Sequence, residues 1–136
     1  MSESVQHQEL VKMIVNFVQT LVPSDYCNLV RADLPEFEKP SLAYDSYIPD
    51  VTFSYKGQLI IGEAKTFEDF NRDHSRNQYE AYIRECMKHP GESTIVIAIP
   101  WQLFITAKNH FVLLKRKYSA DVKVLVISEN GLVDEV

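Results

Sequence analysis

The residues best suited to chemistry are two carboxylates and a lysine in one short segment: Asp50, Glu63 and Lys65. The β-rich runs between the two acids flank Lys56-Gly57, which predicts a hairpin that reverses there and sets Asp50 opposite Glu63. Like charges facing each other at about 5 Å between Cβ atoms destabilise a sheet, unless a cation lies between them. Lys65 is two residues past Glu63 and projects from the same face. We therefore expect a metal-dependent site for phosphate chemistry.

The register of this hairpin is a testable part of the prediction. A two-residue turn pairs Thr52 with Ile61, whereas an odd-length turn would move Asp50 out of line with Glu63. The alternative to a site is an ordinary solvated strand face. Leu59 and Ile61 share the face of Glu63, however, and an unpaired carboxylate on a partly buried face is unfavourable.

Helix and strand patterns alternate around the hairpin. They predict a helix over 5–22, a strand over 26–30, a loop over 33–47, hairpin strands at 50–55 and 58–65, a linker at 66–73, a helix over 75–88, a strand over 94–99, a helix from Pro100, a strand over 122–127 and a tail after Asn130-Gly131. This order predicts an α/β fold with a mixed central β-sheet flanked by helices on both faces.

Composition sets the broad class of protein. A chain of 136 residues is expected to form a single domain over 1–136, and it has neither a membrane span nor the residue order of a signal peptide, so we expect a cytoplasmic location. Cys27 and Cys86 are expected to be two buried or half-buried thiols. The net charge of −5 predicts weak binding to DNA unless symmetry or a partner protein contributes.

The hairpin also carries a recognisable pattern. Pro49-Asp50 is followed, thirteen positions after Asp50, by Glu63-Ala64-Lys65. This resembles the signature of the PD-(D/E)xK nuclease superfamily, and the expected elements over about 5–99 are similar to the restriction-endonuclease-like core of that family. The segment 78–82, Gln-Tyr-Glu-Ala-Tyr, looks like the Gln-x-x-x-Tyr element of one branch, which includes recombination exonuclease domains.

The resemblance implies a Mg²⁺ (or Mn²⁺) site. Asp50 and Glu63 would bind the ion, with the carbonyl of Ala64 as a further oxygen ligand; these hard oxygen donors suit both ions. Lys65 would orient the attacking water or stabilise negative charge on the phosphorus centre. Glu9 lies where many members place another acidic ligand, although its polar neighbours on the helix also fit a solvated surface residue.

The helix after the lysine is implied to complete the site. Gln78 and Tyr82 are four residues apart and so lie on one helix face, with His74 one turn earlier. Gln78 would hold the site or the scissile phosphate and Tyr82 would support it, whereas His74 and Arg76 would contact the substrate. The alternatives are a capping box from Ser75 to Gln78 and a plain core role for Tyr82.

Four other residues are assigned structural roles. His7, His89 and His110 have no ligand-like spacing and are expected at the surface or at helix ends. Trp101, directly after Pro100, is expected to anchor a helix to the sheet rather than to stack on a base.

Together these observations predict a metal-dependent hydrolase that cleaves DNA phosphodiester bonds. A chain close to a bare catalytic core is expected to be a structure-selective or partner-directed endonuclease, like junction-resolving enzymes or viral and mobile-element nucleases. Cutting two strands symmetrically would require a homodimer. The alternatives are an RNA substrate and a non-catalytic module that keeps the fold for nucleic-acid binding or assembly.

Overall fold

The protein is an α/β fold built on one mixed six-stranded β-sheet. The structure, a computed structural model, describes residues 4–41 and 44–136. In chain order the elements are α1 (Val5–Leu21), η1 (Ser24–Leu29), β1 (Arg31–Ala32), β2 (Val51–Tyr55), β3 (Gln58–Ala64), α2 (Asp73–Lys88), β4 (Glu92–Ile99), η2 (Trp101–Leu103), α3 (Phe104–Tyr118), β5 (Lys123–Ser128) and β6 (Val133–Glu135). The strands lie in the order β1-β2-β3-β4-β5-β6. The pairs β3–β4 and β4–β5 are parallel, and the other pairs are antiparallel.

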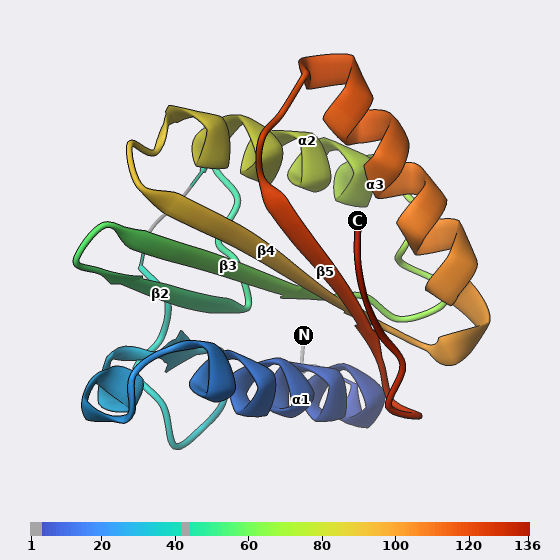
Figure 1. Cartoon of the computed structure of the whole chain (residues 1–136). Helices are drawn as coiled ribbons and strands as arrows, with labels where there is room; N and C mark the ends of the chain where they lie inside the picture. The colour runs from blue at the N-terminus through green and yellow to red at the C-terminus, as the bar shows by residue number, and fades with distance from the viewer. Residues whose placement is uncertain (1–3, 42–43) are drawn as a thin grey trace.

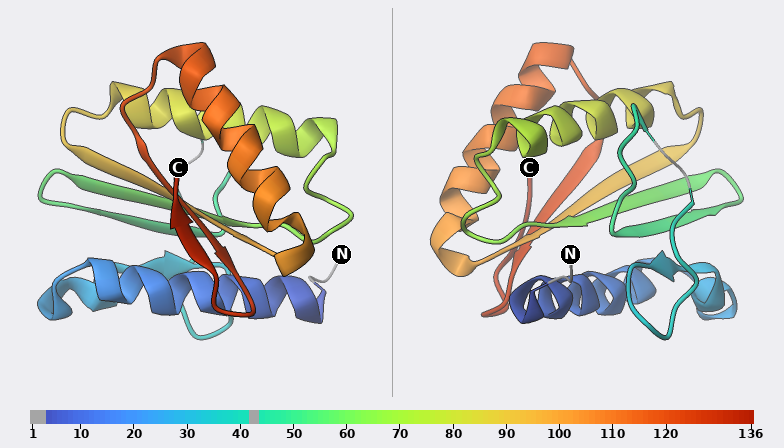
Figure 2. Two further views of the ribbon diagram at one scale, coloured as in Figure 1. Left: turned by 45° about the vertical axis from the view of Figure 1, so that its right-hand side comes forward. Right: turned by 180° about the vertical axis from the view of Figure 1, so that it is seen from behind.

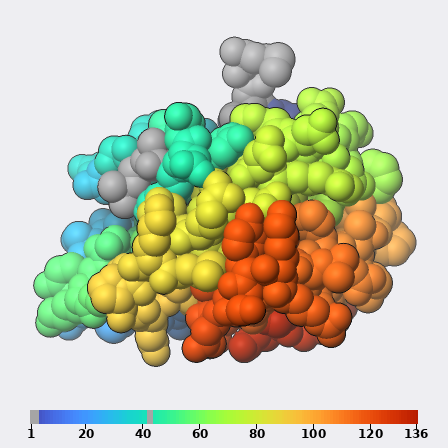
Figure 3. Space-filling view, turned by 90° about the horizontal axis from the view of Figure 1, so that it is seen from above, coloured from blue at the N-terminus to red at the C-terminus, as the bar shows by residue number. Residues whose placement is uncertain are grey.

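Helices cover both faces of the sheet, as the sequence predicts (Figures 1 and 2). The helix α1 packs on one face through a stripe of five buried residues: Leu10, Val11, Ile14, Val15 and Val18. The helices α2 and α3 cover the other face, where Tyr79, Tyr82 and Phe111 belong to the apolar cluster on that side of the sheet. Figure 3 looks down on this second face, with the segment that leads into β2 lying beside α2. Because both faces are covered, the central strands are buried along most of their length.

The β2–β3 hairpin has the predicted register. Its turn consists of Lys56 and Gly57, and both have positive φ, at 49° and 81°. Two consecutive left-handed residues are typical of the tight turn whose twist matches that of the flanking strands. Thr52 therefore pairs with Ile61. The ladder ends one residue short of the acids, with Val51 opposite Gly62, so Asp50 lies just outside β2.

The packing of α1 against the sheet depends on Gly62. A Cβ atom at this position would lie 2.6 Å from Cγ2 of Ile14 and 3.0 Å from Cβ of Val51. Those distances are shorter than van der Waals contact, so only glycine lets α1 lie this close to β3. The first turn of α1 is thereby brought to the end of the strand that carries Glu63.

Two predicted elements differ from the structure. The segment 26–30, predicted to be a strand, lies in the 3₁₀ helix η1 as far as Leu29. Pro23, Ser24 and Asp25 favour a turn, and the N–H of Tyr26 donates to the carbonyl of Pro23 at 2.9 Å. The tail after Gly131 includes a short edge strand, β6, which pairs with β5. At three residues and largely exposed, β6 has too little hydrophobic pattern to be read from sequence.

The second helix begins two residues earlier than expected, at Asp73. Arg72 occupies the N-cap position without a side-chain hydrogen bond, and Ser75 is buried inside the first turn. The interpretation of Ser75 to Gln78 as a capping box is therefore wrong, and Gln78 is available for another role. No helix within 4–41 and 44–136 is both long and apolar enough to cross a lipid bilayer.

Candidate metal centre

The two predicted carboxylates meet at the end of the hairpin. Asp50 precedes β2 and Glu63 lies near the end of β3, and they are only 8% and 4% exposed. Oδ2 of Asp50 accepts a hydrogen bond from the backbone N–H of Ala64 at 2.9 Å. This bond fixes the aspartate carboxylate against the neighbouring strand. The structure thus brings Asp50 and Glu63 together as the hairpin register requires.

His7 joins the two carboxylates from α1. Its Nε2 lies 3.2 Å from Oδ2 of Asp50 and donates to it. One donor atom from each of His7, Asp50 and Glu63 lies within 4.8 Å of the others. His7 lies at a helix end, as expected, but its ring faces the two carboxylates instead of solvent, which was not predicted from the sequence. Its spacing from Val11 and Ile14 was the missed signal, because positions i, i+4 and i+7 share one helix face.

Glu9 is not brought to this cluster. Two residues after His7, it lies about 200° further round the helix. Its side chain is 66% exposed and forms an ion pair with Lys12 at 3.7 Å. The residue of α1 that joins the two carboxylates is thus His7 and not Glu9, and Ser4 helps to place it by accepting the N–H of His7 at 3.0 Å.

Lys65 is held between strand and helix. Its Nζ lies 3.9 Å from Oε2 of Glu63, and it donates a short hydrogen bond to Oε1 of Gln78. Lys65 and Gln78 are each 7% exposed. A buried ammonium needs such partners, since hydrogen bonds to charged groups are among the stronger ones. Gln78 therefore positions the lysine directly beside the carboxylate pair.

Tyr82 is both a core residue and a support for the site, the two roles that its sequence position left open. It is fully buried in the apolar cluster beneath α2, and its hydroxyl donates to Oε1 of Glu63 at 2.7 Å. Burial, reinforced by the charge of Glu63, raises the pKa of Tyr82 above its ordinary value. The hydroxyl consequently stays protonated and keeps donating to the carboxylate.

The surroundings shift the pKa values of Asp50 and Glu63 in opposite directions. Burial, and then the charge of Asp50, raises the pKa of Glu63 well above its ordinary value. Burial also disfavours ionised Asp50, but hydrogen bonds from His7, Glu63 and the Ala64 amide outweigh it and lower the pKa of Asp50. Such a pair holds one proton between two carboxylates, and a bound cation can replace that proton.

The donor set fits a divalent cation. Carboxylate oxygens and a histidine nitrogen are ordinary ligands of first-row divalent metals. Two donor atoms at about 2.1 Å from one ion lie at most about 4.2 Å apart, so small side-chain shifts would suffice. The N–H and C=O of one strand residue point to the same side, which directs the carbonyl of Ala64 toward the side of Asp50. Ala64 can therefore supply the further oxygen that the resemblance implies.

The two residues expected to contact substrate lie on the outside of α2. His74 and Arg76 are both exposed. The structure does not bring either of them into hydrogen-bond contact with His7, Asp50 or Glu63. His74 instead packs its ring against Tyr47, with 5.2 Å between centroids. The side chains of His7 and Asp50 are 12% and 11% exposed, against 5% for Glu63. The site thus opens toward solvent on the side of His7 and Asp50.

Comparison with known proteins identifies no relative of this chain. No protein-family model, curated protein or solved structure matches the chain.

Proposed function

We propose that this protein is a metal-dependent nuclease with the restriction-endonuclease-like core of the PD-(D/E)xK superfamily, and that it hydrolyses DNA phosphodiester bonds. The observation that carries the proposal is the convergence of His7, Asp50, Glu63 and Lys65 at one end of the sheet. Gln78 joins them on the same buried site, through its hydrogen bond to Lys65. Charged groups are rarely buried together without a partner or a ligand, and here two acids share a site.

Each residue has a distinct role in the proposed reaction. A divalent ion bound there would make a hydroxide nucleophile available at neutral pH and neutralise charge on the phosphoryl group. Asp50, Glu63 and His7 would hold the ion, while the Ala64 N–H and the Tyr82 hydroxyl keep the two carboxylates oriented. Lys65, held by Gln78, presents a compact positive charge to the phosphate as negative charge develops.

The histidine bears on which metal the site prefers. Mg²⁺ favours an all-oxygen shell, whereas imidazole suits transition metals, and Mn²⁺ accepts both kinds of ligand. The donor set of two carboxylates and His7 therefore supports Mn²⁺ as the better cofactor and Mg²⁺ as the weaker one.

The experiment is a cleavage assay with supercoiled plasmid, single strands and a four-way junction, in Mn²⁺, Mg²⁺ or EDTA. We expect metal-dependent cleavage that is abolished in Asp50→Ala and Lys65→Ala. Lys88→Ala is the matched control, because Lys88 is an exposed lysine on α2 that pairs with Glu85. Cleavage in EDTA, or full activity in Lys65→Ala, would refute the proposal. Binding of nucleic acid without cleavage of any substrate would favour the non-catalytic alternative.

A further inference from the structure

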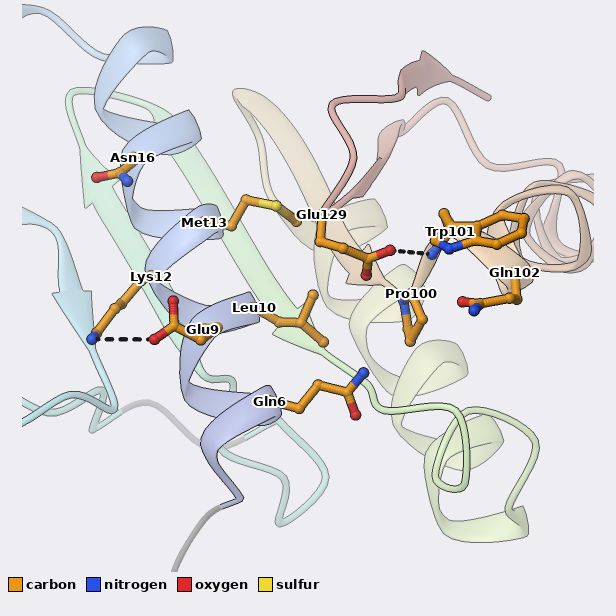
Figure 4. Close-up of a pocket in the computed structure, with 10 residues that line it drawn as sticks. All are labelled: Gln6, Glu9, Leu10, Lys12, Met13, Asn16, Pro100, Trp101, Gln102 and Glu129. Atoms are coloured by element: carbon orange, nitrogen blue, oxygen red, sulfur yellow. Dashed lines mark hydrogen bonds and ion pairs between the residues drawn. The ribbon is translucent and has the colours of Figure 1, made fainter.

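A groove of about 610 Å³ lies beside the candidate metal centre (Figure 4). One wall is α1, including Gln6, the residue before His7. The other wall is Pro100 and Trp101, two and three residues past Ala98, whose carbonyl accepts the N–H of Lys65 at 3.0 Å. The groove and the metal centre therefore share the first turn of α1 and the same edge of the sheet.

Trp101 lines this groove and has a large exposed aromatic surface. Its side chain is not the internal anchor that the sequence predicts, because the residue is 53% exposed. In Figure 4 its backbone stands across the groove from α1 and its indole extends away from α1 at the rim, and its backbone N–H donates to Oε1 of Glu129 at 2.8 Å. The backbone is thus held in place while the indole stays accessible. An accessible indole on a held backbone is suited to stacking on a flat ring.

The polar lining matches an uncharged ligand with donors and acceptors at its edge. Glu9 and Lys12 pair with each other, and Glu129 accepts the Trp101 N–H, so each of these charged groups in the lining has a partner. The remaining polar side chains are the amides of Gln6, Asn16 and Gln102. Amides both donate and accept hydrogen bonds, and they pair well with base edges.

We infer that this groove binds an unpaired nucleobase of the substrate strand, stacked on Trp101, beside the phosphodiester that is cut at the metal centre. This inference rests on the proposed nuclease function and specifies its substrate class. A base inside a duplex is stacked on both sides and enters such a groove only after extrusion. The substrate is therefore a single strand, or a flap or loop with unpaired nucleotides.

The overall charge of the protein agrees with this substrate. Duplex binding without sequence preference depends on many contacts from lysine and arginine to phosphates, which a net charge of −5 disfavours. Stacking adds about 1–3 kcal/mol per base without requiring positive charge. A chain with an acidic balance gains affinity for unpaired strands by this route.

Trp101 also supplies the test, because it is the only tryptophan in the chain. Its fluorescence can be followed while the protein, in EDTA so that no cleavage occurs, is titrated with three oligonucleotides of equal length. These are a thymidine single strand, the same strand with abasic sites throughout, and a blunt duplex. We expect quenching by the single strand and little change with the abasic strand or the duplex. Equal quenching by the abasic strand, or no quenching by any of the three, would overturn the inference.

A labelled single strand followed by fluorescence anisotropy gives the matching affinities. Stacking of one base predicts a loss of roughly 5- to 150-fold for Trp101→Ala, with most of the affinity kept in Trp101→Phe. Leu113→Ala is the control, because Leu113 is a 63% exposed apolar residue on α3. Unchanged affinity in Trp101→Ala overturns the inference, as does concentration-dependent quenching without DNA, which would assign the groove to a second copy of the chain. Because both readouts avoid cleavage, an inactive protein that still shows them would refute only the nuclease proposal.

Discussion

Replacing Glu63 with glutamine should stabilise the metal-free protein. The donor atoms of Asp50 and Glu63 lie within 4.8 Å, and two full charges at that distance repel by about 3.5 kcal/mol at an effective dielectric constant of about 20. Lys65 and His7 offset part of this repulsion. At a pH above the folded-state pKa of Glu63, where both acids are ionised, we expect Glu63→Gln to raise the free energy of unfolding by about 1–3 kcal/mol, in line with the stability that active sites commonly sacrifice.

The pH dependence gives the prediction its sign. The pKa of Glu63 is higher in the folded protein than the ordinary value of 4.5. At any pH between these two pKa values, the folded protein holds a proton that the unfolded chain has lost, so folding takes up a proton. The stability that this proton provides is present below pH 4.5 and is lost as pH rises through the pKa of the folded state. Glutamine never ionises. The gain in Glu63→Gln should therefore be near zero at low pH and should grow toward neutral and alkaline pH.

Bound metal should make the wild type more stable than Glu63→Gln, which is the reverse of the order expected without metal. An ion present at about 100 times its dissociation constant adds about 2.7 kcal/mol to the wild type, and for 136 residues each kcal/mol raises the melting temperature by about 3.5 °C. The variant should lose most of this shift. Thermal unfolding in EDTA and in Mn²⁺ tests both statements, with exposed Glu92→Gln as the control. A variant that is less stable than the wild type in EDTA, or one with a full metal shift, would show that the reasoning is wrong.

Three further substitutions probe the same site. His7→Ala should weaken Mn²⁺ binding, measured by calorimetry, by about tenfold or more while affecting Mg²⁺ less; an equal loss for both ions would contradict the assigned role of His7. Gly62→Ala should cost about 1–3 kcal/mol in urea unfolding because its Cβ would lie 2.6 Å from Ile14, and an unchanged midpoint would show that α1 can move freely. Gln78→Ala should lower kcat with little effect on metal affinity, because Gln78 contacts Lys65; a large loss of metal binding would instead make it part of the metal centre.

The hairpin could be predicted because its determinants are local. The type of turn at Lys56-Gly57 sets the register, and the register decides that Asp50 and Glu63 meet. The face of α2 that carries Gln78 and Tyr82 followed in the same way from helical spacing. The capping box at Ser75 was wrong because the helix starts earlier, where its N-cap residue, Arg72, has no side-chain hydrogen bond to mark it.

The contribution of α1 could not be predicted as readily. Glu9 matched the family expectation for a carboxylate, but the rotation of the helix is decided by which stripe is buried, and burying that stripe turns His7 and not Glu9 toward the two carboxylates. Trp101 was misplaced for a related reason. The periodicity of α3 shows which residues are apolar, yet it does not reveal that η2 comes first and leaves the indole outside.

The position of His7 in the first turn of α1 has a kinetic consequence. Helix ends fray far more often than helix centres, and this end is capped by the hydrogen bond from the N–H of His7 to the side chain of Ser4. Of the three side chains proposed to bind the cation, His7 is thus the one that can dissociate from it without disturbing the sheet. We therefore expect fraying of the helix to set the residence time of a bound ion, so that a change at Ser4 speeds ion exchange while the carboxylate pair remains intact.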